Sequence, residues 1–168
     1  MKSGLALLLA GILLAPLTAA ESPSLAVRIQ RLEDIEQIRV VLLNYGRYLD
    51  AHDFAAYSQL FAKDGEWTGG FGSVKGPAAI QAFMEKNIPG PNTGHTFHLL
   101  SNFVIEVHGD TATAWSRWTY ITPNAEKRPA MAQAGHYDDQ LVRENGHWKF
   151  RRRVAGNDIP TMEPAAKK

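Results

Sequence analysis

Apolar residues recur every three or four positions from Leu25 to Leu49, a spacing that predicts one long helix with a single buried face. The stripe consists of Leu25, Ile29, Leu32, Ile35, Ile38, Val41, Leu42, Tyr45 and Leu49. The charged side chains of Asp34, Glu36, Arg39 and Arg47 lie off this face. The pattern stops at DAHDF, residues 50–54, so the helix is expected to end there.

A second, shorter helix is expected to begin after Asp53, whose side chain can cap its first turn. Its inward side chains would be Phe54, Tyr57, Leu60 and Phe61. The letters KDG, residues 63–65, then predict a turn of the chain, and EWTGGFG, residues 66–72, a short strand that runs into a bend. GPAAIQAFMEKN, residues 76–87, predicts a third helix with Pro77 at its first position.

Beyond residue 94 the apolar period changes from helical spacing to two, which is the spacing of strands. Four strands are predicted, at residues 95–107, 111–122, 131–142 and 147–154. Helices followed by an antiparallel meander predict an α+β fold, with the three helices of the N-terminal half packed on a curved, mostly antiparallel sheet. We expect a cone-shaped α+β barrel whose interior holds a small molecule.

The two ends of the chain are expected to lie outside this domain. Residues 1–20 have the charged start, short apolar run and small-residue cleavage site of a secretory signal peptide. This predicts a periplasmic or secreted protein that does not insert in a membrane once the signal is cleaved. Residues 21–31 would form an N-terminal extension, and residues 160–168 a flexible tail.

The composition limits which ligands and which kinds of site are expected. The 18 Lys and Arg residues nearly balance 17 Asp and Glu residues, which gives no electrostatic reason to expect nucleic acid. The basic run KFRRR, residues 149–153, is typical of an alternating strand with one solvated face. The chain has no Cys and no HExxH motif, so neither a disulfide framework nor a metal site is expected. A small neutral or amphiphilic ligand fits this composition better.

The candidate chemistry lies in the strand that contains GHTFHLLSN, residues 94–102. Alternation places Thr96, His98, Leu100, Asn102 and Val104 on one face, with His95 pointing the other way. His98 then faces inward, and burial of its imidazole requires a hydrogen-bond partner. Asp50, at the end of the long helix, one turn beyond Tyr45 and close to Tyr48, is the candidate partner. A carboxylate that holds one ring nitrogen would make the other a better base. The alternative is a satisfied core histidine beside a carboxylate that caps local backbone.

The other four histidines are weaker candidates. His52, His108 and His147 fall in predicted turns, where solvation is expected, and His136 shares a face with Asp138 only as a weak ligand pair.

Three stretches resemble the SnoaL-like family of the nuclear transport factor 2-like superfamily, particularly its hexachlorocyclohexane dehydrochlorinase and scytalone dehydratase members. They are YLDAHDFAAYSQLFAKDGEWTGGFGSVKGPAAI, HTFHLLSN with its HxxxN spacing, and GHYDDQLVRENGHWKFRRRV. The resemblance covers residues 32–159, which we take as the domain.

The resemblance implies an elimination without metal or organic cofactor. His98, oriented by Asp50, would remove a proton from carbon, while Arg153 would steady the departing anion and Trp67 would wall the cavity. Ser116 stands where scytalone dehydratases carry a second histidine, and Tyr137 stands near their asparagine. The remaining expected pocket residues are Tyr45, Tyr48, Leu100, Asn102 and Trp118.

Strict alternation sets a condition on the role of Arg153. It places Arg153 with Lys149 and Arg151, opposite Trp148 and Phe150, so Arg153 turns inward only if its strand bulges or bends.

Three functions remain open from the sequence. The first is a cofactor-free lyase or isomerase, of the dehydratase, dehydrochlorinase or isomerase type, acting on a small hydrophobic or cyclic compound. The second is a periplasmic binding or accessory protein without catalysis. The third is an interaction module, for which Trp115 and Ile121 on one face of a strand and Trp118 and Tyr120 on the other could serve a pocket and a contact between copies. The resemblance also implies a homodimer or homotrimer.

Overall fold

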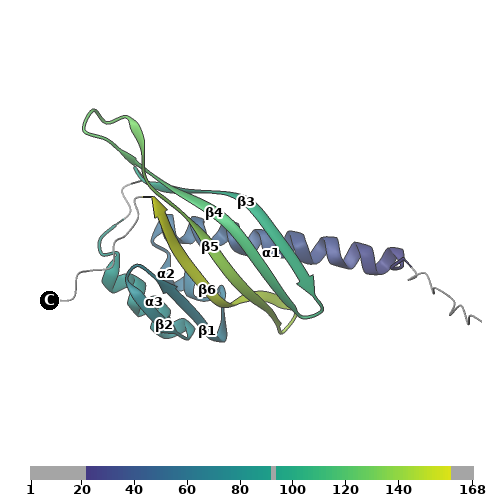
Figure 1. Ribbon diagram of the computed structural model, residues 1–168. Helices are drawn as coiled ribbons and strands as arrows, with labels where there is room; N and C mark the ends of the chain where they lie inside the picture. The colour runs from purple at the N-terminus through teal and green to yellow at the C-terminus, as the bar shows by residue number, and fades with distance from the viewer. Residues whose placement is uncertain (1–21, 92–93, 160–168) are drawn as a thin grey trace, which may run out of the picture.

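The computed structural model describes residues 22–91 and 94–159, and within them three helices precede most of the sheet (Figure 1). The expected signal peptide and C-terminal tail lie outside these residues. The helices are α1 (Leu25–Ala51), α2 (Phe54–Ser58) and α3 (Pro77–Asn87). Ser24 caps α1 and Asp53 caps α2, each accepting a hydrogen bond from a backbone N–H three residues on.

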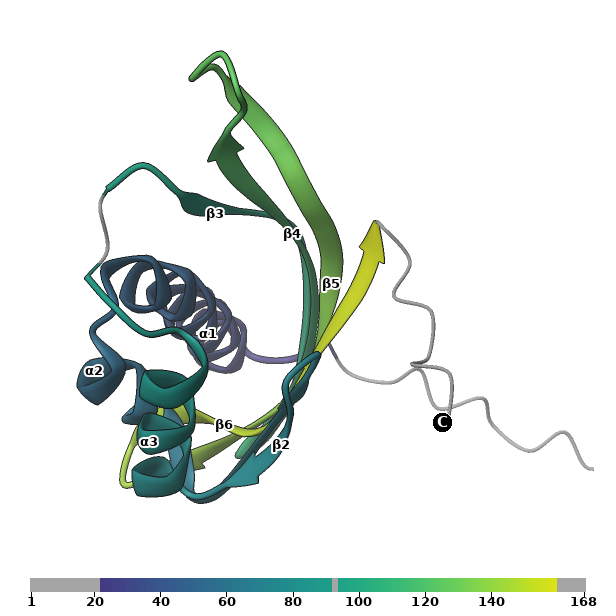
Figure 2. The ribbon, with the colours of Figure 1, turned by 90° about the vertical axis from the view of Figure 1, so that its left-hand side faces the viewer.

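A six-stranded sheet has the order β2-β1-β6-β5-β4-β3, with β2 and β3 at its open edges. The strands are β1 (Phe61–Gly69), β2 (Gly72–Lys75), β3 (Phe97–His108), β4 (Thr111–Pro123), β5 (Pro129–Glu144) and β6 (His147–Ile159). Every pairing is antiparallel except that of β1 with β6. The sheet curves around α1 (Figure 2), which confirms the expected α+β fold of three helices on a curved, mostly antiparallel sheet. The edge strands β2 and β3 do not pair with each other, so the expected cone-shaped barrel is not closed.

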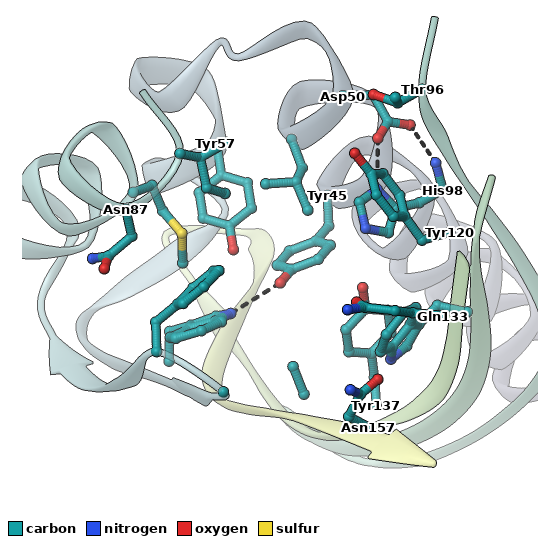
Figure 3. Close-up of a pocket in the computed structure, with 18 of the residues that line it drawn as sticks. Tyr45, Asp50, Tyr57, Asn87, Thr96, His98, Tyr120, Gln133, Tyr137 and Asn157 are labelled. Carbon is teal, nitrogen blue, oxygen red and sulfur yellow. Dashed lines mark hydrogen bonds and ion pairs between the residues drawn. The ribbon is translucent and has the colours of Figure 1, made fainter. Parts of the chain in front are cut away.

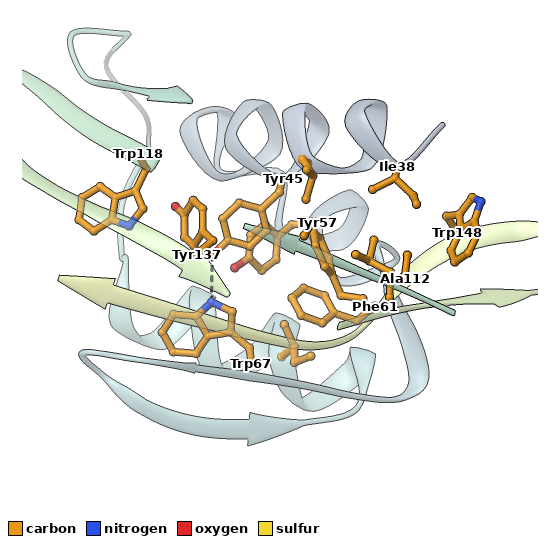
Figure 4. Close-up of a cluster of buried hydrophobic side chains, with 14 of the residues drawn as sticks. Ile38, Tyr45, Tyr57, Phe61, Trp67, Ala112, Trp118, Tyr137 and Trp148 are labelled. Carbon is orange, nitrogen blue, oxygen red and sulfur yellow. Dashed lines mark hydrogen bonds between the residues drawn. The ribbon is translucent and has the colours of Figure 1, made fainter. Parts of the chain in front are cut away.

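The long helix was predicted with one buried stripe, and only part of that stripe is buried. Ile38, Leu42 and Tyr45 are almost completely covered, and they join the aromatic core (Figure 4). Leu25, Ile29 and Leu32 are between 46% and 67% exposed. These three side chains lie on the side of α1 opposite Ile38, Leu42 and Tyr45, and the first turns of the helix run past the end of the sheet (Figure 1), so the prediction of burial was wrong there.

Two local predictions in the α2 to β1 region were wrong. The KDG segment does not reverse the chain, because it lies inside β1 at an irregularity between Phe61 and Glu66 in the pairing with β6. Gly65 is required there, since a Cβ would lie 2.6 Å from the Phe150 carbonyl oxygen. Helix α2 ends at Ser58, so Phe61 begins a strand rather than closing a helix.

A β-bulge in β3 changes which side chains face inward. The register with β4 shifts between Ser101 and Val104, and Asn102 has a positive φ of 54°. Asn tolerates this left-handed conformation better than most residues. Beyond the bulge, Phe103 faces inward, whereas Asn102 and Val104 are exposed. The alternation that placed Asn102 and Val104 with His98 was therefore wrong.

A second bulge lies in β6. Phe150 pairs with Leu141 and Arg152 with Gln140, so Arg151 is the extra residue. This shift buries both Phe150 and Arg153, each with 0% exposure. Strict alternation predicted that Arg153 would turn inward only if its strand bulged or bent. This bulge is such an irregularity.

A polar network joins α1 to the other end of the sheet, away from the core tyrosines. Asp34 on α1 was expected off the buried face, and it is buried instead. It accepts hydrogen bonds from Arg143 Nη2 at 2.8 Å, Trp148 Nε1 at 3.2 Å and Gln30 Nε2 at 3.2 Å. Burial alone would raise the pKa of Asp34, but these hydrogen bonds outweigh it and hold the pKa below its ordinary value. The carboxylate therefore stays ionised while it ties α1 to β5 and β6.

This network predicts a stability that depends on pH. A carboxyl whose pKa is lower in the folded than in the unfolded state stabilises the fold above the unfolded pKa, and the contribution is lost as the pH falls through the folded pKa. We expect the protein to lose stability below about pH 4, and Asp34→Asn to lose less over the same range. Urea unfolding at neutral and acid pH measures this. Asp110→Asn is the control, because Asp110 also pairs with Arg143 but its side chain is 80% exposed. An unchanged pH dependence in Asp34→Asn would contradict the account.

Candidate functional site

A cavity of about 440 Å³ opens between the helices and the concave face of the sheet (Figure 3). Side chains from α1, α2, α3 and β1, and from the strands β3 to β6, line it. The lining is mainly aromatic and aliphatic, with a few polar groups, which is the usual composition of a small-molecule site.

Asp50 and His98 meet at one side of this cavity (Figure 3). Asp50 Oδ1 lies 2.6 Å from His98 Nδ1, and Asp50 Oδ2 accepts a hydrogen bond of 2.8 Å from the His98 backbone N–H. Both carboxylate oxygens are thus bound to one residue. The side chains of His98 and Asp50 are only 17% and 19% exposed, respectively. Close packing of α1 on β3 helps, since a Cβ at Gly46 would lie 2.8 Å from Leu100 Cδ1.

The contact fixes the chemical character of the imidazole. A carboxylate only accepts hydrogen bonds, so His98 Nδ1 carries the proton and donates it to Asp50. In the neutral ring, Nε2 is then an unprotonated acceptor. Tyr120 packs on the ring with centroids 4.7 Å apart, which further restricts its orientation. The arrangement can therefore act as a proton acceptor whose orientation is set in advance.

Aromatic side chains form the walls of the cavity. Trp118 lies 6.0 Å from the His98 ring, and its Nε1 donates to the His136 and Gly156 carbonyl oxygens, both at 3.2 Å. Gly135 makes room for it, since a Cβ there would lie 2.6 Å from the indole. On the opposite wall, the indole of Trp67 donates from Nε1 to Tyr45 Oη at 2.9 Å.

The polar groups of the cavity are mostly neutral. Tyr57 and Tyr137 are buried, and burial raises the pKa of each phenol well above its ordinary value. Both hydroxyls therefore stay protonated at neutral pH. Tyr57 Oη and Asn157 Oδ1 are buried polar atoms of the cavity lining without a hydrogen-bond partner among the described residues. Such atoms are available to a ligand.

Arg153 does not line the cavity, which corrects the expected contact with a departing anion. Its guanidinium donates from Nε and Nη2 to the two oxygens of Asp139, both at 2.7 Å. It also stacks on Tyr45 and Tyr137, with its Cζ 3.9 and 4.0 Å from the ring centroids. Burial raises the pKa of Asp139 against the opposing effect of Arg153. The two short hydrogen bonds keep Arg153 and Asp139 ionised. The guanidinium packs against the rings of Tyr45 and Tyr137, outside the cavity lining.

The structure sorts the other expected site residues into two groups. Those that line the cavity with Asp50 and His98 are Tyr45, Trp67, Trp118 and Tyr137. Those outside its lining are Tyr48, Leu100, Asn102 and Ser116. Tyr48 and Leu100 pack at the edge of the core, Ser116 is fully buried, and Asn102 is turned outward by the β3 bulge.

Several lining residues were missed by sequence reasoning. They include Leu49, His52, Tyr57, Phe71, Met84, Asn87, Ile88, Thr96, Gln133 and Asn157. His52 was expected in solvent, but it ends α1 in a left-handed conformation, lines the cavity, and binds the Gly90 carbonyl oxygen through Nδ1 at 2.7 Å. Tyr57 was assigned to the core. Alternation had placed Tyr120 on the same face of its strand as Trp118, and both residues line the cavity.

Among residues 22–91 and 94–159, no cluster of three or more His, Cys, Asp or Glu side chains could hold a metal ion. In the same part of the chain, no helix is long and apolar enough to cross a membrane.

Comparison with known proteins agrees with this geometry. A family model described as a SnoaL-like domain matches residues 30–154. The chain belongs to the SnoaL-like family. A search of curated proteins found no match to this SnoaL-like protein.

Solved structures resemble this SnoaL-like protein over most of its length. A nuclear transport factor 2-like protein with a cystatin-like fold from Novosphingobium aromaticivorans is 29% identical, with a TM-score of 0.71 over 82% of this chain and 90% of the other. A candidate scytalone dehydratase from the same organism is 22% identical, with a TM-score of 0.63 over 82% and 97%. LinA is 19% identical, with a TM-score of 0.66 over 82% and 98%. The last two likenesses establish the fold alone.

Proposed function

We propose that this SnoaL-like protein is a cofactor-independent proton-transfer enzyme, of the lyase or isomerase type, that acts on a small hydrophobic or cyclic compound. The observation that carries the proposal is the Asp50 carboxylate bound through both oxygens to His98 at the wall of an aromatic cavity. A buried imidazole with one nitrogen held by a carboxylate and the other toward a cavity is suited to remove a proton from carbon.

In the proposed reaction His98 Nε2 accepts the proton and becomes part of an imidazolium that Asp50 stabilises. The electrons of the broken C–H bond form a double bond, either with loss of a leaving group from the neighbouring carbon or with reprotonation elsewhere. His98 acts on the substrate, Asp50 positions His98, and Trp67, Trp118 and Tyr120 enclose the substrate. Arg153 has no part at the reacting atoms, since it is bound to Asp139.

Export to the periplasm or the exterior belongs to the same proposal and depends on the signal-like residues 1–20. Growth of the source cell with a tagged chain, followed by fractionation and N-terminal sequencing, tests it. We expect a mature N-terminus at Glu21 outside the cytoplasm, and an intact Met1 in the cytoplasm would contradict export.

Deuterium uptake at carbon tests the proposed chemistry even before the substrate is identified. Panels of cyclic hydroxyketones and halogenated cyclic hydrocarbons are incubated with the protein in D₂O and followed by NMR and mass spectrometry. We expect exchange or elimination with at least one compound, and its loss by about 10²-fold or more in His98→Gln. His95→Gln is the matched control, because His95 is exposed and lies three positions from His98.

Three outcomes of this experiment are decisive. Loss in His98→Gln with full activity in His95→Gln supports the proposal. Compounds that bind equally well to both variants and never react point instead to a non-catalytic binding protein. Turnover that survives in His98→Gln would contradict the assigned base.

A further inference from the structure

The outward face of α1 carries an apolar surface that its own domain leaves uncovered. This outer stripe consists of Leu25, Ile29, Leu32, Val40 and Leu43, with exposures of 67%, 46%, 66%, 47% and 46%. At 100° per residue these side chains fall within about a quarter of the helix circumference, opposite the buried Ile38, Leu42 and Tyr45. The helix is therefore apolar on two faces, and residues 22–91 and 94–159 of a single copy leave about half or more of the outer one exposed.

The spacing of the outer stripe is that of a helix that pairs with another helix. Leu25 and Leu32 are seven residues apart, as are Ile29, Glu36 and Leu43, which gives the alternating steps of four and three of a paired seam. Glu36 and Arg39 interrupt the seam, and they neutralise each other through an ion pair of 2.8 Å within the same helix. The interruption limits the strength of pairing but adds no net charge to the seam.

Charged residues beside the outer stripe indicate which partner binds it and how the two helices are oriented. Arg28 lies on one flank and Glu33 on the other, and neither side chain has a hydrogen bond or ion pair with the rest of the described chain. Five residues apart, they cannot meet within one helix. In two parallel helices in register, residues five apart on opposite flanks meet across the seam, so Arg28 of each copy faces Glu33 of the other. An antiparallel arrangement would bring the two Arg28 flanks together.

We propose that two copies of this chain pair through the outer stripes of α1, parallel and in register, with two intermolecular Arg28 to Glu33 ion pairs. A second copy is the occupant because the same helix supplies both the apolar seam and both charges of each pair. The projection of the first turns of α1 past the sheet leaves room for this contact (Figure 1). The inference does not depend on the proposed function.

Sedimentation velocity over a concentration series tests the pairing on the chain from Glu21 onward, the form that the proposed export would leave. We expect a reversible dimer, and a monomer for Ile29→Glu/Leu32→Glu with an unchanged circular dichroism spectrum. The control is Val104→Glu, which also replaces an exposed apolar residue by glutamate, at a residue that is 55% exposed on the outer face of the sheet. A wild-type monomer, or a dimer that Val104→Glu dissociates while the α1 variant stays paired, overturns the proposal.

Reversal of the flanking charges tests the direction of pairing. Arg28→Glu and Glu33→Arg should each weaken the dimer about tenfold, and the double variant should restore it, because both ion pairs are re-formed with opposite signs. The natural chain has no Cys, so Leu32→Cys provides a single thiol. Parallel pairing in register places the two thiols opposite each other, and mild oxidation should link the copies. A double variant that stays as weak as the single ones, or a Leu32→Cys protein that does not link, overturns the parallel arrangement.

Discussion

Asp139→Leu should destabilise the protein by about 3–5 kcal/mol, because it leaves the buried guanidinium of Arg153 without its counterion. Arg153 is fully buried, and its Nη1 already lacks a hydrogen-bond partner among the described residues. Replacing both residues, as Asp139→Leu/Arg153→Met, should recover most of this loss, because the apolar pair needs no desolvation of charge. Urea unfolding of the single and double variants measures the two free energies.

An exposed ion pair provides the control for this prediction. Arg117 Nη1 lies 3.0 Å from Asp158 Oδ2, and the two side chains are 50% and 33% exposed. Arg117→Met should cost about 1 kcal/mol or less, since exposed pairs contribute little. If Asp139→Leu were no more costly than Arg117→Met, the buried pair would not be a support of the core.

Asp50→Asn should lower turnover by about 10²–10⁴-fold while leaving substrate binding nearly unchanged. The amide keeps the shape of the carboxylate, but it can no longer both accept the Nδ1 proton of His98 and balance the charge of an imidazolium. The loss is therefore expected in kcat rather than in KM. Steady-state kinetics with a compound found by the deuterium screen measures it.

Asp53→Asn is the matched control for Asp50→Asn. Asp53 lies three residues further on and caps α2 through a 3.0 Å bond from the Ala56 backbone N–H. Asn is an equally good capping residue, so turnover and stability should both be retained. Turnover in Asp50→Asn that falls by less than tenfold would mean that His98 acts without an orienting carboxylate.

The elements of the fold could be predicted because each had a clear period. The helical spacing that ends at Leu49 and the alternation beyond residue 94 reflect faces that are buried along most of their length. The contact between Asp50 and His98 followed from the same reasoning, because each residue occupies the inward face of its element. Ile29 and Leu32 continue the steps of three and four, but repeated steps of three rotate around the helix, so both residues lie on the face opposite Ile38 and stay exposed.

The bulges could not be predicted from the period, and they account for most errors at the site. One inserted residue in β3 turned Asn102 outward, and one in β6 buried Arg153 against Asp139. A single extra residue leaves the composition of a strand unchanged, so alternation alone cannot place it. Lining residues such as His52 were missed because their position depends on how a helix ends and which loop it then meets.

The protonation of the His98 ring tests the central claim most directly. Long-range ¹H–¹⁵N NMR correlations distinguish the nitrogen that carries the proton from the one that does not, without substrate. At a pH where the ring is neutral, the account predicts a single tautomer with the proton on Nδ1 and a bare Nε2, and a loss of this single tautomer in Asp50→Asn. A neutral ring with its proton on Nε2, or the same tautomer mixture in both proteins, would contradict it.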